Sequence, residues 1–294
     1  MPKQISDKTL WYLINIKARR NQTPQHYVDA FKELKKSDPL VHFPRGGKSA
    51  SVGNIEFVNS NDSIFEEEIP QCIILKLLSY TIVDKKAFYN KQTREDLYIE
   101  NWNDDIVANK KDADIYFIPS VHTAVVRRNS RITLNNVVCY LKEVLDRIEP
   151  EGFDVDVIID RDALMRISKA HAITRIQANI SYSNHNGFAN TFGTFTKELD
   201  DKLREAESQR TEIIMQGSTK HPLKNEEGGI LQSIMNISES NGYVTATVQE
   251  NEGDRQLTKI DSRKFPKLQT IWLKSKEIWR DIYNTIVKPN NRTP

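Results

Sequence analysis

Alternation of hydrophobic and polar positions with a period of two runs through much of the chain and predicts strands. It is clear at residues 9–18, and again in the stretch NGYVTATVQENEGDRQLTKID, residues 241–261. In that stretch one alternating run ends at Gln249, a polar loop follows, and a second run begins at Arg255. This pattern predicts a β-hairpin with a polar outer face. Further strands are predicted at residues 51–59, 71–83, 112–119, 121–128, 153–160, 172–183, 211–216 and 267–273.

Helical periodicity appears in separate segments, two of which have clear end signals. Thr23 stands at the N-cap and Pro24 at the first helical position of a helix predicted over residues 23–36, positions that these residue types favour. A second amphipathic helix is predicted over residues 133–148, ended by Pro150. Further helices are predicted at residues 162–171, 194–208, 226–240 and 275–287, with Asn241 and Gly242 stopping the helix at 226–240.

The change of pattern after Pro150 predicts a domain boundary. Strands and helices mix without the strict alternation of a doubly wound sheet, so we predict an α+β protein. Its N-terminal α+β domain would comprise residues 1–150, and its C-terminal α+β domain, with a terminal helix, residues 151–294. Each domain is expected to contain a mixed or antiparallel sheet with packed helices.

The composition favours a cytoplasmic protein without membrane insertion. The chain has 294 residues, of which 38% are hydrophobic, and no apolar run approaches the roughly 18 residues that span a bilayer. Its first residues lack the basic start and apolar core of a secretory signal. Cys72 and Cys139 lie in apolar stretches, which favours buried free thiols in a reducing compartment.

The net charge of +2 is distributed unevenly, and both ends of the chain are basic. Residues 1–50 carry 10 basic and 4 acidic side chains, and residues 259–294 carry 9 and 3. Cations neutralise phosphates and aromatic rings stack on bases, which is the chemistry of sequence-tolerant nucleic-acid binding. The predicted phosphate contacts are Arg127, Arg128, Arg131, Arg263, Lys264 and Lys267, with Trp272 as a candidate for stacking.

This interpretation depends on basic side chains from distant parts of the chain converging on one patch. Arg255 and Lys259, in the predicted hairpin, would extend that patch. The alternative is that the aromatic residues belong to the core and the lysines form a solvated rim.

Acidic residues leave a metal-dependent nuclease open as an alternative. Asp154, Asp156 and Asp160 alternate on one face of a predicted strand, where carboxylates could hold Mg²⁺. Asp84 and Lys86 follow another strand, in an order that suits a metal ligand beside a lysine. Neither set forms a specific motif, and no histidine or cysteine pair has the spacing of a zinc site. We therefore assign no catalytic residue, metal or cofactor.

A protein–protein sensor for a phage component is a further alternative. It would use the polar loop at residues 183–193 and the helix predicted at 194–208. The apolar stripe of that helix is narrow, as in a helix that lies on the surface.

The second half of the chain resembles an uncharacterised family of bacterial and prophage proteins found among phage-exclusion and defence genes. The likeness rests on the order of VDVIIDRDALMRISKAHAITRIQANIS, the polar helix KELDDKLREAE and the hairpin that begins NGYV, and it covers about residues 150–273. That family shares a broad layout with the RexA-like exclusion proteins of lambdoid phages. No catalytic residues carry over from it, and the loop at residues 183–193 departs from its pattern.

The resemblance implies a role in phage exclusion or antiviral defence. Together with the basic segments, it predicts a non-enzymatic protein that binds nucleic acid or a phage protein–DNA complex. We expect DNA rather than RNA as the ligand, and a homodimer is an open alternative to a monomer.

Overall fold

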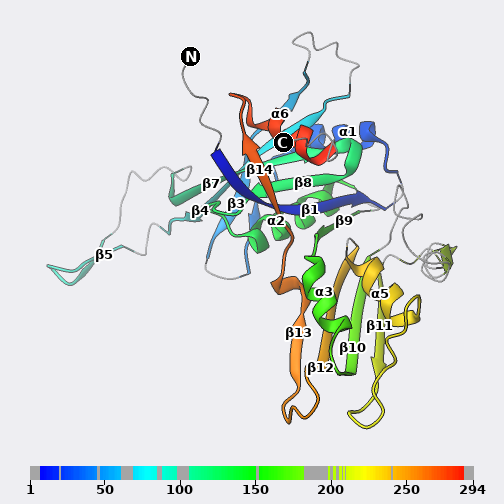
Figure 1. Ribbon diagram of the computed structural model, residues 1–294. Helices are drawn as coiled ribbons and strands as arrows, with labels where there is room; N and C mark the ends of the chain where they lie inside the picture. The colour runs from blue at the N-terminus through cyan, green and yellow to red at the C-terminus, as the bar shows by residue number, and fades with distance from the viewer. Residues whose placement is uncertain are drawn as a thin grey trace.

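The computed structural model describes residues 7–19, 21–44, 47–60, 69–84, 88–97, 106–149, 152–181, 210–239 and 241–287, with a few isolated positions between 198 and 208. Within these ranges the chain folds into antiparallel sheets with helices packed on them (Figure 1). This confirms the α+β prediction. The loop predicted at 183–193 lies outside the described residues, and the helix predicted at 194–208 lies outside them except for those isolated positions.

The first and larger sheet is organised around β1 (Asp7–Ala18). One side of β1 pairs with β8 (Thr123–Arg127). Its other side pairs with two strands in succession, β14 (Leu268–Leu273) along the first half and β9 (Phe153–Val157) along the second. Beyond β8 the sheet continues through β7 (Val107–Ile118), β4 (Cys72–Ile82), β3 (Ser49–Val58) and β2 (Val41–His42). A separate two-stranded hairpin consists of β5 (Phe88–Asn90) and β6 (Glu95–Leu97).

The second sheet has the order β11 (Arg210–Gln216), β10 (Ala172–Ser181), β12 (Gly242–Gln249) and β13 (Thr258–Asp261). Its strands fall between β9 and β14 in the sequence, while both of those strands belong to the first sheet. The two sheets therefore do not divide the chain at residue 150. The chain leaves the first sheet after β9 and returns to it at β14.

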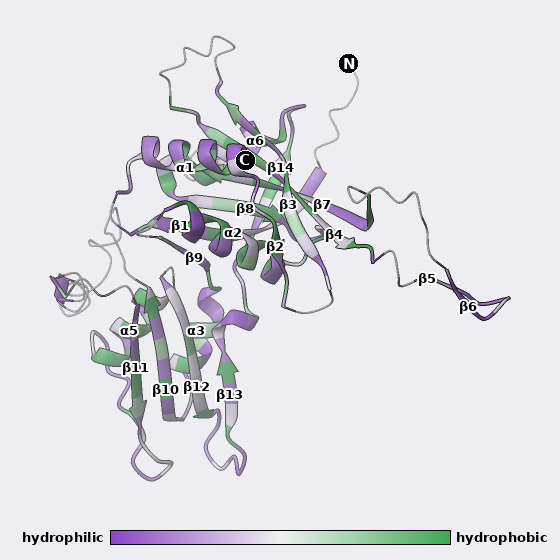
Figure 2. Cartoon of the chain, turned by 180° about the vertical axis from the view of Figure 1, so that it is seen from behind, coloured by the Kyte–Doolittle hydropathy of each residue, from purple (hydrophilic) through white to green (hydrophobic). Residues whose placement is uncertain are grey.

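The stretch at residues 241–261 forms the predicted hairpin, with β13 at the edge of the second sheet. Residues of β12 alternate between buried and half-buried positions, and Figure 2 shows hydrophilic and hydrophobic residues mixed along these strands. The second strand begins at Thr258, three residues later than predicted. In the preceding loop the Asp254 carboxylate accepts the amide of Asn251 at 2.9 Å.

Gly242 begins β12 rather than ending a helix. A Cβ atom at this position would lie 1.9 Å from the carbonyl oxygen of Asn179 in β10, and φ is +146°. Only glycine allows the two backbones to approach so closely. The preceding helix, α5 (Ile230–Ser238), ends earlier, with Glu239 in a right-handed conformation.

Helices cover both faces of the first sheet and one face of the second. The helices α1 (Pro24–Ser37) and α2 (Leu134–Ile148) pack on one face of the first sheet, and α6 (Ile278–Val287) packs on the other. The helices α3 (Arg161–Ser168) and α5 contribute to the core of the second sheet. As predicted, Thr23 caps α1, and its hydroxyl accepts the amide of His26 at 3.4 Å. No helix in the described part of the chain is long and apolar enough to cross a membrane.

Candidate nucleic-acid interface

Three of the predicted phosphate contacts lie together where β8 ends and the chain turns towards α2. Arg127 is the last residue of β8 and pairs with Trp11 of β1. The amide of Arg128 donates to the carbonyl oxygen of Leu10 at 2.9 Å, and the amide of Ser130 donates to that of Arg127 at 3.0 Å. The backbone of this turn is therefore fixed to the sheet, while the side chains of Arg127, Arg128 and Arg131 are exposed.

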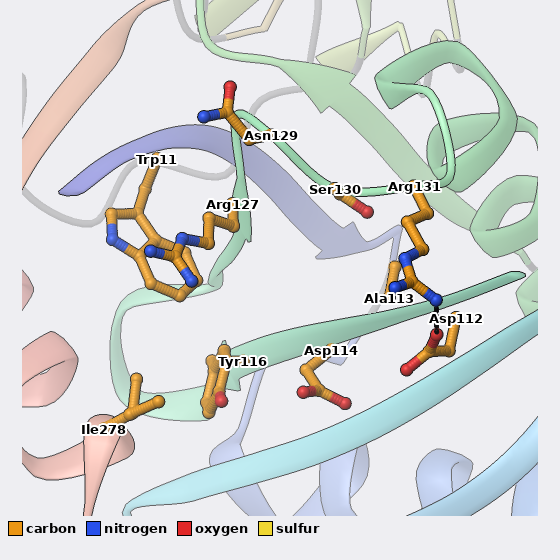
Figure 3. Close-up of a pocket in the computed structure, with 10 residues that line it drawn as sticks. All are labelled: Trp11, Asp112, Ala113, Asp114, Tyr116, Arg127, Asn129, Ser130, Arg131 and Ile278. Atoms are coloured by element: carbon orange, nitrogen blue, oxygen red, sulfur yellow. Dashed lines mark ion pairs between the residues drawn. The ribbon is translucent and has the colours of Figure 1, made fainter.

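The turn borders a pocket of about 340 Å³ on the face of the first sheet that also packs α6 (Figure 3). Strands β1, β7 and β8, the turn itself and the first residue of α6 contribute to its lining. The lining residues are Trp11, Asp112, Ala113, Asp114, Tyr116, Arg127, Asn129, Ser130, Arg131 and Ile278.

Aromatic side chains form a fixed apolar wall of this pocket. The rings of Trp11 and Tyr116 meet edge to face, with centroids 5.7 Å apart. The indole N–H of Trp11 donates to the hydroxyl of Thr9 at 2.7 Å, and that hydroxyl donates to the carbonyl oxygen of Ile271 in β14 at 3.1 Å. Ile278 of α6 also lines this side. The orientation of the indole is thus set by packing and by hydrogen bonds.

The two arginines that line the pocket differ in whether they have an acidic partner among the described residues. Arg131 forms an ion pair with Asp112 at 3.8 Å, and three-quarters of its side chain is exposed. Arg127 makes no ion pair with any described residue. In Figure 3 its guanidinium group lies beside Trp11. An arginine that is exposed and unpaired on a rigid strand end is available to an anionic ligand.

Asp114 places a carboxyl group opposite that arginine. The pairing of Ile115 with Val126, continued by one residue, puts Asp114 across from Arg127. Burial raises the pKa of Asp114, the ammonium group of Lys76 on β4 lowers it, and nearby carboxylates raise it further. Burial, followed by the nearby carboxylate of Asp114, raises the pKa of Tyr116 to about 12, so its hydroxyl remains a hydrogen-bond donor at neutral pH.

Trp272 lies close to this site but on the opposite face of the sheet. Trp272 on β14 pairs with Lys8 on β1, and its side chain is 45% exposed. Successive residues of a strand point to opposite faces, so Lys8 and Trp272 point away from the face that carries Trp11. One strand, β1, separates Trp272 on β14 from Arg127 on β8, and Trp272 does not line the pocket.

The remaining predicted contacts lie in the connection between β13 and β14. Arg263 forms two hydrogen bonds with the carboxylate of Asp261, at 2.9 and 2.8 Å, and lies 4.1 Å over the ring of Tyr243. Its guanidinium is therefore engaged in the second sheet. Lys264 and Lys267 are exposed. Lys267 precedes Trp272 by five residues, which corresponds to roughly 16 Å along an extended strand.

The predicted basic residues therefore converge only in part. The arginines of residues 127–131 share one turn beside a pocket, whereas residues 263–267 form a separate group where the two sheets meet. Arg255 precedes β13 at the tip of the hairpin, which extends away from the first sheet (Figure 1). Lys259 is exposed on β13 itself.

The aspartates of the alternative nuclease site are divided between two roles. Asp160 caps α3, with its Oδ1 atom accepting the amide of Asp162 at 2.9 Å. Asp154 and Asp156 point to one face of β9, where Arg19 lies 3.4 Å from Asp154.

Asp156 is surrounded by donors from other elements. The hydroxyl of Ser181 donates to its Oδ2 atom at 2.6 Å, and Lys142 and Arg210 approach its Oδ1 atom at 3.8 and 4.0 Å. Among the described residues, no group of three or more metal-ligating side chains could hold an ion. Lys86, of the other proposed nuclease pair, lies outside them.

The predicted site residues did not include Trp11, Asp114 or Tyr116. Each lies in a segment whose hydrophobic pattern predicts a strand but no site. The pocket forms only when these strands pair with one another. The one signal that could have identified the site is the pair of acidic residues, Asp112 and Asp114, at alternate positions of the run DADIYFIP.

The comparison with protein families covers nearly the whole chain. A model described as a domain of unknown function, DUF4747, matches residues 7–288. The chain belongs to the DUF4747 family. The matched range includes both sheets and α6, so these parts belong to one DUF4747 unit. No curated protein matches the chain. The DUF4747 description names no activity, so the predicted role in phage exclusion stays a prediction.

Proposed function

We propose that this chain binds single-stranded nucleic acid, with DNA as the expected ligand, and that it does so without catalysing a reaction. The observation that carries the proposal is the turn at residues 127–131, which holds arginine side chains beside a pocket with aromatic walls. Arginine neutralises phosphates and aromatic rings contact bases, and both are needed to hold a single strand without reading its sequence.

The rigidity of the turn supports this role. Hydrogen bonds of 2.9 and 3.0 Å fix the backbone around Arg127 and Arg128. Little backbone conformational entropy is therefore lost when a phosphate binds. Arg127 is free to form a charge-assisted hydrogen bond, and Arg131 has only a long, exposed ion pair to give up. A pocket of about 340 Å³ is at the lower end of the size range of ligand sites, which suits a single nucleotide better than a duplex.

The setting that we propose is phage exclusion or antiviral defence, in which the ligand would be phage DNA or a protein–DNA complex. This part of the proposal is supported by the resemblance of residues 150–273 to proteins of that setting. The nuclease alternative has less support, because Asp154 and Asp156 face cationic and hydroxyl groups of the chain itself.

Binding to a labelled single-stranded DNA oligonucleotide is expected to weaken steeply as salt is added. If three arginines each contact a phosphate, the logarithm of the association constant should fall with the logarithm of salt concentration with a slope of about −2. Fluorescence anisotropy measures this directly, and a duplex of the same sequence serves as the comparison. The proposal fails if no DNA or RNA binds at low salt, or if binding is indifferent to salt. Recovery of intact oligonucleotide after incubation with Mg²⁺ or Mn²⁺ would separate binding from nuclease activity.

A further inference from the structure

The pocket beside Arg127 contains a feature that phosphate binding does not require. Asp114 lines it within the same cross-strand row as Arg127 and Trp11. A carboxylate repels a phosphate, so a ligand that enters this pocket must turn its anionic part towards Arg127 and a hydrogen-bond donor towards Asp114. Trp11, Tyr116 and Ile278 line the pocket with apolar atoms, Trp11 and Tyr116 being themselves only 3% and 6% exposed, and this lining suits contact with a flat ring.

We propose that this pocket takes one unpaired nucleobase that carries an exocyclic amino group, with Asp114 accepting a hydrogen bond from that amino group and Arg127 binding the adjoining phosphate. This inference rests on the proposed binding of single-stranded nucleic acid, and it names what the site selects. Adenine, cytosine and guanine have such an amino group, whereas thymine and uracil present carbonyl oxygens at the equivalent position.

Two physical reasons limit the ligand to an unpaired base. In a duplex the second hydrogen of the amino group is exposed only in the major groove, so a base must leave the helix before its ring can enter a pocket beside Asp114. The pocket is bounded on one side by Arg131 and its partner Asp112, and on another by Ile278 at the start of α6 (Figure 3). Those walls leave room for a single ring system within about 340 Å³.

The charge balance of the site also fits a neutral amino donor. The groups facing Asp114 are Lys76 on β4, which attracts its negative charge, and Asp112 and Glu56, which repel it. Asp114 is exposed, so its carboxylate can accept a hydrogen bond from a donor that enters the pocket, and that bond would offset the partial desolvation that raises its pKa.

The test measures base preference, because overall affinity alone would not separate this site from a basic surface. Short fluorescein-labelled homopolymers of dC, dA and dT are titrated with the full chain at low salt. We expect dC and dA to bind about tenfold more tightly than dT, the effect of one hydrogen bond to a charged acceptor. In Asp114→Asn this ratio should fall to about one, while the affinity for dT stays the same or rises because a repulsive charge is removed.

Asp96→Asn is the control. It removes one carboxylate charge from the exposed β5–β6 hairpin, which does not line the pocket, so the preference for dC and dA should remain. Equal binding of the three homopolymers by the unaltered chain, or an unchanged preference in Asp114→Asn, would overturn the base pocket while leaving salt-dependent binding intact. A complete absence of binding to every homopolymer would overturn both this inference and the proposed function.

Discussion

The double charge reversal Arg127→Glu/Arg131→Glu is expected to lower the affinity for single-stranded DNA by roughly 100-fold at low salt. Both side chains line the pocket and both project from the fixed turn after β8. Losing two phosphate contacts should also make the salt dependence shallower by about 1.4 in slope. Anisotropy titrations at several salt concentrations measure both quantities. The variant should fold normally, since both residues are exposed and Arg131 has only a 3.8 Å ion pair to lose.

The control for that experiment is Arg175→Glu/Lys220→Glu, which changes the net charge by the same amount. Arg175 lies on β10 of the second sheet and Lys220 in the loop after β11, and both are exposed. Its affinity should fall by less than about threefold, the effect of a remote change in charge that is largely screened by salt. Similar losses in the two variants would mean that DNA responds to overall charge and not to the pocket.

The sequence predicted those elements that local signals determine. The N-cap threonine of α1, the helical periodicity of α2 and the alternation in β12 act within a few residues, and each of these elements forms where it was expected. The order of strands depends on contacts that no local signal carries. The pairing of β1 with β14 joins residues that lie more than 250 positions apart, as in the bond between Thr9 and Ile271.

The same distinction applies to the candidate site. Arg127, Arg128 and Arg131 were predicted because a cluster of cations in a turn is visible in one short segment. Trp11 and Asp114 could not be predicted, because they join Arg127 only through the register of three strands. Arg263 looked equivalent to the other arginines in sequence, but its carboxylate partner lies two residues away and its aromatic partner on β12.

The junction between the two sheets is held by largely buried charges, one of which is Asp154, a predicted candidate for a metal ligand. Asp154 is directly opposite Lys17 on β1, and only 13% of its side chain is exposed. Its Oδ2 atom accepts no hydrogen bond from the described residues. The amino group of Lys17 donates to the side chain of Asn241 at 2.6 Å, just before β12. This network links β1 and β9 to the second sheet.

At neutral pH, the buried charge of Asp154 lowers the stability of the folded chain. Burial raises its pKa to about 6, with Arg19 opposing and Asp156 adding to the shift, and Arg210 also lowering it. Because the folded pKa is above the unfolded value of about 3.9, the folded chain binds more protons than the unfolded chain between these pH values. Stability contributed by this group is therefore present below about pH 4 and is lost as the pH rises through about 6.

Asp154→Asn is accordingly expected to stabilise the chain by about 3 kcal/mol at pH 7 and to have little effect near pH 4. Asparagine has the shape of the protonated aspartate and carries no charge that burial would penalise. Urea denaturation at the two pH values measures the difference between the variant and the unaltered chain, and other titrating groups cancel from that difference. The exposed Asp96→Asn, in the β5–β6 hairpin, should change stability by less than about 0.5 kcal/mol at both pH values. A loss of stability in Asp154→Asn at pH 7 would instead mean that the charged pair with Arg19 stabilises the junction more than burial of the carboxylate costs.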